Sequence, residues 1–177
     1  MTQPAPEALR VIRSRRVVRA MTSHPVTHDQ LDTILETASF APSAGNRRLH
    51  PLVVVTNQAR LQVLRLVSPG MLQRPAAAIV ICIDQAAAGR YGFRKGTPGL
   101  YVDVGTLAAT LLLAAHASGL GSGPVTSFSR AAAARVLDLP DGWDPQLIVC
   151  LGQPADRQPP GMRAGRRREA MAHILWR

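Results

Sequence analysis

Apolar residues recur along this chain at two different spacings. Helical spacing predicts helices within 8–16, 28–40, 57–67, 101–118 and 129–139, with Thr27 and Ser129 suited to cap two of them and Pro42 expected to stop the second. Apolar runs rich in β-branched residues predict buried strands over 51–56, 76–84 and 146–152. We expect a loop over 85–99 and a short strand or loop within 119–128. The pattern predicts one α+β domain over residues 7–177, after a flexible tail of residues 1–6.

The helix predicted over 101–118 is apolar on almost every side, and Gly119 is placed to end it. Asp103 and His116 interrupt its apolar run, so we expect no membrane span. A chain of 177 residues is too small to cover such a helix completely. The helix is therefore predicted to lie at the interface between two subunits, so that the protein would be a homodimer.

Arginine dominates the charge of the chain. Lys and Arg number 21 and Asp and Glu 11, which gives a net charge of +10, and Lys95 is the only lysine. This excess suits phosphate binding, but an arginine- and alanine-rich composition explains it equally well. No helix-turn-helix, zinc finger or aromatic RNA-binding motif accompanies the arginines, so we expect no nucleic-acid partner.

The residues that often carry catalysis are sparse and badly spaced. The five histidines and two cysteines show no metal-ligand spacing, and Cys82 and Cys150 lie in strand-like runs, where we expect buried thiols. The N-terminus has no apolar signal segment, and we expect a cytoplasmic protein. A chain with few candidate acid–base side chains and several arginine clusters is typical of an enzyme whose cofactor carries the chemistry.

The segment RRVVR is a candidate phosphate clamp. In an extended segment, Arg15, Val17 and Arg19 point to one side and Arg16 to the other. Two guanidinium groups on one side can hold a phosphate, although a solvated basic surface has the same pattern.

Four segments, in order, resemble the nitroreductase family of flavin enzymes. They are RSRRVVR, APSAGNRRLHPLVVV, DVGTLAATLLLAAHASGLGSGPVTSF and LDLPDGWDPQLIVCLGQP, at 13–19, 41–55, 103–128 and 137–154. The resemblance implies a three-layer α/β/α sandwich with a mainly antiparallel central sheet, in an intertwined homodimer whose C-terminal tails wrap the partner. It also implies FMN bound by both chains at their interface, with NAD(P)H as electron donor.

The same resemblance assigns residues to the flavin. Arg15, Arg16, Val17 and Arg19 would surround the phosphate and ribityl chain, completed by Arg166 and Arg167. Pro42, Ser43, Ala44 and Asn46 would come from the partner chain, and Ser68 would face the pyrimidine end. Pro124, Val125, Thr126 and Ser127 would line the isoalloxazine ring, with a backbone N–H near Thr126 at flavin N5. No residue is assigned as catalytic, and no metal is expected.

Some positions depart from the family pattern. Val17 replaces a serine, and Arg48, Leu49 and His50 stand where the family has Gln, Pro and Trp. Arg48 would then contact the pyrimidine ring and raise the flavin potential, unless it points into solvent.

The implied activity is NAD(P)H-dependent reduction of a nitro, quinone or enone acceptor. The run at 64–84 also resembles the flavin subunit of cyclic dipeptide oxidases, which needs a small partner subunit. A flavin-binding protein without turnover is the third reading.

Overall fold

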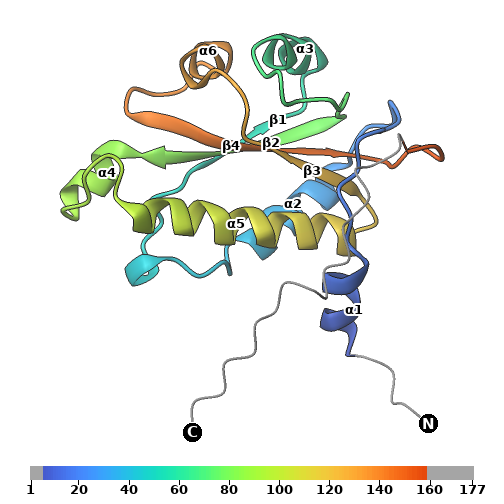
Figure 1. Cartoon of the computed structure of the whole chain (residues 1–177), viewed down its shortest axis with the longest axis horizontal. Helices are drawn as coiled ribbons and strands as arrows, with labels where there is room; N and C mark the ends of the chain where they lie inside the picture. Colours follow the sequence, from blue (N-terminus) through green and yellow to red (C-terminus); the bar gives the residue numbers. More distant parts are fainter. Residues whose placement is uncertain (1–5, 159–177) are drawn as a thin grey trace, which may run out of the picture.

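A computed structural model describes residues 6–158 as three layers (Figure 1). The middle layer is a sheet of four strands: β1 (Leu52–Val55), β2 (Ala77–Asp84), β3 (Gly121–Val125) and β4 (Trp143–Gly152). One face carries α3 (Gln58–Leu66) and α6 (Arg130–Val136), and the other carries α2 (His28–Ala38) and α5 (Pro98–Ala117). The remaining elements are α1 (Glu7–Ser14), the 3₁₀ turn η1 (Ala44–Asn46) and α4 (Gln85–Arg90).

The sheet is antiparallel throughout, in the order β1-β2-β4-β3. The two central strands are buried on both faces, which agrees with their continuous apolar runs. β4 begins three residues earlier than predicted, and its Pro145 lies opposite Cys82, where the register shifts by a bulge. A bulge accommodates proline inside a strand because the ladder is interrupted there.

Local signals in the sequence set most helix ends. The Thr27 side chain accepts from the backbone N–H of Gln30, and Gln30 Oε1 accepts from the backbone N–H of Thr27, so α2 opens on a capping box. Ser129 caps α6 by accepting from Ala132 N. The predicted helices and caps are confirmed here, with shifts of a few residues at the ends.

Two predictions were wrong in detail. Residues 85–99 are not all loop, because Asp84 accepts from Ala87 N at 2.8 Å and starts helix α4 in a run of three alanines. Helix α2 ends at Ala38 rather than beside Pro42. The N–H groups of Phe40 and Ala41 donate to carbonyls three residues back, so the chain tightens into turns before the proline restricts it.

Helix α5, with 20 residues, is the longest helix among residues 6–158. Leu100, Val104 and Leu111 are buried against α2 and the sheet, and Gly119 with φ 76° ends the helix as predicted. By length and composition α5 could cross a membrane, but its buried face belongs to the hydrophobic core. Within one chain it is not covered on all sides, since Val102 is 63% exposed.

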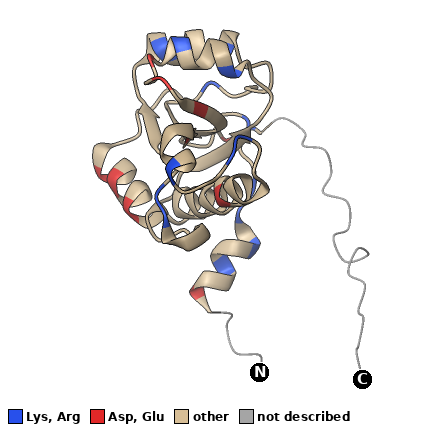
Figure 2. Ribbon diagram, turned by 90° about the vertical axis from the view of Figure 1, so that its left-hand side faces the viewer, with Lys and Arg blue, Asp and Glu red and all other residues tan. Residues whose placement is uncertain are grey.

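The charges do not gather on a single face. Figure 2 shows both basic and acidic residues spread over several helices, strands and loops, with one group of acidic residues along a single helix. Residues 1–5 of the predicted tail 1–6 lie outside the described residues, as do all residues beyond 158, including Arg166, Arg167 and the terminal ILW.

Candidate functional site

The segment after α1 runs alongside β3 and adds to the edge of the sheet. Val17 forms a parallel bridge with Ser122, and Val18 N donates to Ser122 O at 2.9 Å. Gly121 permits this approach, because a Cβ there would lie 2.8 Å from the Val18 side chain. The predicted phosphate segment is thus fixed to the strand that leads into Pro124–Ser127.

Side chains alternate along this segment. Ser14, Arg16 and Val18 line one cavity of about 260 Å³ together with His116, and Arg15, Val17 and Arg19 do not. This agrees with the predicted alternation of Arg16 against its odd-numbered neighbours. The Arg16 guanidinium donates to the carbonyls of Arg13 and Arg15, at 2.7 and 2.9 Å, so part of its donor capacity serves the end of α1.

Gln73 joins the same neighbourhood from the chain that precedes β2. Its side chain is almost fully buried, and its Nε2 donates to Val18 O at 3.4 Å. A Cβ on Gly123 would lie only 2.2 Å from that Nε2 atom. Glycine at 123 therefore leaves the space that Gln73 occupies between the N-terminal segment and β3.

The turn that holds Ser68 packs against the loop after β3. Gly70 N donates to Ser127 O at 2.9 Å, and Ser129 N donates to Val67 O at 2.9 Å. A Cβ on Gly70 would lie 2.9 Å from the Ser127 Cβ, so only glycine fits. The structure thus brings Ser68 and Ser127, which are far apart in the sequence, into one region.

Seven buried side-chain polar atoms have no hydrogen-bond partner among residues 6–158, and four of the seven lie on the segments just described. These four are Arg15 Nη1, Ser68 Oγ, Gln73 Oε1 and Ser122 Oγ. A buried polar group left unpaired costs about 1–3 kcal/mol, so such a cluster is typical of a site for a polar ligand. A guanidinium, two hydroxyls and an amide fit the phosphate, polyol and pyrimidine edge of a flavin mononucleotide.

The loop from Ala41 to Arg48 is held by α5. Both Asp103 carboxylate oxygens accept from Ala44 N, at 3.1 and 3.0 Å, and Thr106 Oγ1 donates to Pro42 O at 2.9 Å. Gly45 and Asn46 have positive φ, of 63° and 52°, which makes the sharp reversal. The small residues of this loop therefore lie on an anchored backbone.

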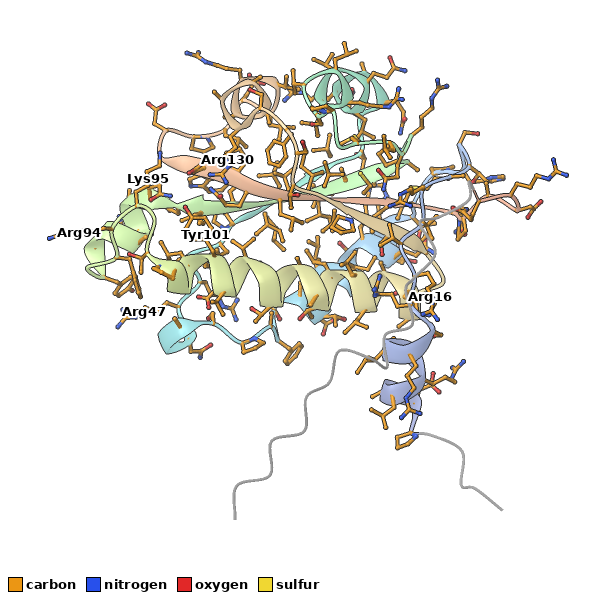
Figure 3. The ribbon with its side chains drawn as sticks, in the orientation of Figure 1. Arg16, Arg47, Arg94, Lys95, Tyr101 and Arg130 are labelled. Atoms are coloured by element: carbon orange, nitrogen blue, oxygen red, sulfur yellow. The ribbon has the colours of Figure 1, made fainter. Side chains whose placement is uncertain are left out.

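The arginine segment 15–19 and the 41–48 loop, both predicted to bind the flavin, lie near opposite ends of α5. Asp103 and Thr106 hold the 41–48 loop near the start of the helix, whereas Ser14 Oγ meets His116 Nε2 at 2.7 Å near its end. His116 follows Asp103 by thirteen positions along the helix, or roughly 20 Å at 1.5 Å per residue. Figure 3 shows Arg47 and Arg16 at these two ends. One chain does not bring the two groups together.

Sequence reasoning gave no role to Asp103, Thr106, Gln73 or Gly70. Asp103 carried a usable signal, because a lone acid in an apolar helix needs a partner when it is buried. The other three had none, since their partners lie far away in the sequence.

The two cysteines take no part in this region. Burial raises the pKa of Cys82 and of Cys150 to about 12, with Asp144 adding to the shift at Cys82. Both thiols are therefore neutral packing groups, as predicted. Within residues 6–158 no three His, Cys, Asp or Glu side chains are grouped to hold a metal ion.

The sequence matches the model of the nitroreductase family over residues 12–81 and 64–153. The chain belongs to the nitroreductase family. One similar protein, from Methanothermobacter thermautotrophicus, is provisionally named NADH dehydrogenase/NAD(P)H nitroreductase. It is 30% identical over 164 residues, which cover 89% of this chain and 81% of that protein. The 5,6-dimethylbenzimidazole synthase of Rhodobacter capsulatus is also 30% identical, over 88% of each chain.

Solved structures of nitroreductase-family proteins share the fold. Nitroreductase A from Vibrio parahaemolyticus superimposes with a TM-score of 0.75 at 27% identity, over 88% of this chain and 70% of that one. A protein of Parabacteroides distasonis gives a TM-score of 0.79 at 24% identity, over 97% and 100% of the two chains. The chain is thus a flavin NAD(P)H oxidoreductase of the nitroreductase family.

Proposed function

We propose that the protein is an FMN-dependent homodimer that takes hydride from NAD(P)H and passes it to a nitro, quinone or enone acceptor. The observation that carries this proposal is the cluster of unpaired buried atoms on Arg15, Ser68, Gln73 and Ser122, where three distant segments converge. Bound FMN would supply the reversible hydride transfer that the chain's own side chains lack. The relative from Bacillus subtilis named FMN reductase supports the choice of flavin.

The residues of this chain then bind and orient the cofactor. Arg15 and Arg19 would hold the phosphate by charge-assisted hydrogen bonds. Ser68 and Gln73 would form hydrogen bonds with the polar edges of the flavin, which water solvates when the cofactor is free. The backbone from Pro124 to Ser127, joined to Gly70 through Ser127 O, would form the wall along the ring.

The second chain is needed to complete this site. The 41–48 loop is anchored roughly 20 Å along α5 from the arginine segment, so its small residues would serve the flavin held mainly by the partner. Exposed apolar side chains support such pairing: Leu9, Ile12, Phe40, Tyr101 and Val102. Light scattering at micromolar concentration should give twice the chain mass of 19.0 kDa, and the mass of a single chain would contradict the dimer.

Membership of the family does not identify the electron acceptor, which depends on the residues that line the substrate pocket. Relatives of similar identity have names as different as FMN reductase and 5,6-dimethylbenzimidazole synthase. Our second candidate is a flavin oxidase of the cyclic dipeptide oxidase type that works with a small partner subunit. It rests on the sequence resemblance at 64–84, and the names of the relatives given above lend it no support.

Anaerobic titration of the purified protein with NADH and NADPH tests the proposal. A yellow protein that binds FMN and bleaches rapidly with either nucleotide supports the reductase, and the faster nucleotide identifies the donor. A yellow protein that resists both nucleotides but bleaches with a cyclic dipeptide, once the small subunit is added, supports the oxidase. A protein that binds no FMN contradicts both activities.

A further inference from the structure

The other three of the seven unpaired buried atoms lie where β2 ends and β4 begins. They are Gln85 Nε2, Asp144 Oδ2 and Gln146 Oε1. Gln85 N donates to Gly142 O at 2.9 Å, and Gln146 Nε2 donates to Asp144 O at 3.0 Å, so the three residues share one neighbourhood. A second cluster of unpaired polar atoms is typical of a second polar ligand site.

A pocket of about 390 Å³ opens beside this cluster. Gln85 and Asp144 line it, together with Lys95 from the α4–α5 connection and Arg130 from α6, and its other lining residues are small or apolar. Figure 3 shows Lys95 and Arg130 at the same end of the molecule. None of the residues assigned above to the flavin lines this pocket.

The pocket also lies far along β4 from the unpaired Ser122 hydroxyl. Ser122 is paired with Leu151, which follows Asp144 by seven positions along the strand. Seven residues of extended chain span roughly 23 Å at about 3.3 Å per residue. The pocket is therefore separate from the place where the arginine segment joins β3.

Positive charge exceeds negative charge around the pocket. Lys95 and Arg130 are cations, and among the described residues Asp144 is the one acid that lines it. Arg130 Nη1 lies 4.0 Å from Asp144 Oδ2, beyond hydrogen-bond distance, and Lys95 takes part in no ion pair within residues 6–158. The donor groups of both cations are therefore available to an anion.

The unpaired atoms favour a ligand that carries hydroxyl groups beside its anion. Gln85 Nε2 only donates hydrogen bonds, and an ionised Asp144 oxygen only accepts them. A hydroxyl group does both, so a polyol satisfies the two atoms with one type of group. A phosphomonoester supplies three acceptor oxygens and about 1.5 to 2 negative charges at pH 7, which suits two cations better than a carboxylate does.

We propose that the pocket binds the phosphomonoester of a polyol, with the phosphate on Lys95 and Arg130 and hydroxyl groups paired with Gln85 Nε2 and Asp144 Oδ2. Free polyol phosphates and the phosphorylated ribose of NADPH share this chemistry. The site goes beyond the flavin chemistry proposed above and does not depend on it.

Calorimetry on the flavin-loaded full-length protein tests the ligand class, because FMN then occupies the other phosphate site. The probes are glycerol 3-phosphate, glycerol, inorganic phosphate and propyl phosphate, which has the same chain without hydroxyl groups. We expect glycerol 3-phosphate to bind most tightly, the two other phosphates about fivefold more weakly for want of a hydrogen bond, and glycerol not measurably. Propyl phosphate that binds as tightly as glycerol 3-phosphate, or no binding of either, would overturn the proposal.

Variants with matched controls locate the phosphate. Lys95→Gln and Arg130→Gln should each weaken glycerol 3-phosphate about tenfold, the effect typical of a charge-assisted hydrogen bond. Arg94→Gln is the control for Lys95, because it removes the neighbouring cation, which does not line the pocket. Arg135→Gln on α6 is the control for Arg130 for the same reason. Controls that weaken binding as much as the pocket variants would assign the effect to overall charge and overturn the proposal.

Asp144→Asn tests the hydroxyl contact. The change removes a negative charge that opposes the phosphate and leaves a weaker acceptor for the hydroxyl group. Inorganic phosphate should therefore bind more tightly, while the preference for glycerol 3-phosphate over propyl phosphate should fall. An unchanged preference would overturn the assignment of Asp144. Should this variant fail to fold, Lys95→Gln against Arg94→Gln decides, since both positions are exposed on the α4–α5 connection.

Steady-state kinetics distinguish the two sources of the ligand. If the ribose of NADPH occupies the pocket, Lys95→Gln should raise KM for NADPH about tenfold and leave KM for NADH unchanged. If the ligand is a free polyol phosphate, neither KM changes although calorimetry shows the weakened binding. A protein that binds FMN but none of the phosphate probes contradicts this site alone, whereas one that binds glycerol 3-phosphate but no FMN contradicts the proposed function alone.

Discussion

Removal of the Asp103 carboxylate should loosen the 41–48 loop and weaken flavin binding together. Asp103 is only 6% exposed, and its oxygens lie 3.1 and 3.0 Å from Ala44 N. A hydrogen bond to a charged group contributes about 1.5–3 kcal/mol to stability. Removing the carboxylate also removes the cost of burying its charge, which offsets part of this loss. We therefore expect Asp103→Ala to lower the free energy of unfolding by about 1–2 kcal/mol.

Two further variants divide this effect. Asp103→Asn keeps one acceptor oxygen and should cost about half as much. Thr106→Val removes the bond from Thr106 Oγ1 to Pro42 O, at 2.9 Å, and should cost about 1 kcal/mol. Because both residues hold the same loop, the double variant should depart from the sum of the single effects.

Urea unfolding followed by circular dichroism measures the stability of these variants, and fluorescence titration measures their FMN affinity. The loop must be reordered before it can lie along the flavin, so Asp103→Ala should bind FMN about tenfold more weakly. Arg94→Gln, an exposed change on the α4–α5 connection, is the control and should alter neither quantity. An Asp103→Ala protein within 0.5 kcal/mol of the wild type, with unchanged FMN affinity, would refute the role of α5 as anchor.

Three other outcomes are expected. Arg19→Ala should reduce FMN affinity by about 1.5–3 kcal/mol, with FAD binding no better than FMN in the wild type, and an unchanged FMN affinity would remove Arg19 from the phosphate site. Arg48→Gln should lower the flavin midpoint potential by tens of millivolts in spectroelectrochemistry, whereas a potential steady within a few millivolts would assign Arg48 to the surface. Burial raises the thiol pKa of Cys82 and Cys150 from 9.0 to about 12, so unfolded thiols ionise first and stability should fall as pH rises above about 9; both thiols should react with a thiol reagent at pH 8 only after denaturation, and rapid labelling of the folded protein would contradict their burial.

Much of the fold is predictable because its signals are local. The capping box at Thr27, the cap at Ser129 and the apolar runs of β2 and β4 each depend on residues a few positions apart. The ordered motifs also placed the chain in its family, which the match over residues 12–81 and 64–153 confirms. The helix α4 was missed because the glycines and proline of the 85–99 segment obscured the cap that Asp84 provides.

The sequence by itself determined most of the helices and strands, the buried thiols and the family, since each follows from short-range spacing or from an ordered set of motifs. Only the tertiary structure decided what those elements bring together. The bond between Ser14 and His116 spans 102 residues, and that between Asp103 and Ala44 spans 59. Such contacts depend on how helices and strands pack, and no local rule fixes the distance between residues on different elements. Packing also set the arginine segment and the 41–48 loop at opposite ends of α5, which is why one chain alone does not unite the residues predicted to hold the flavin.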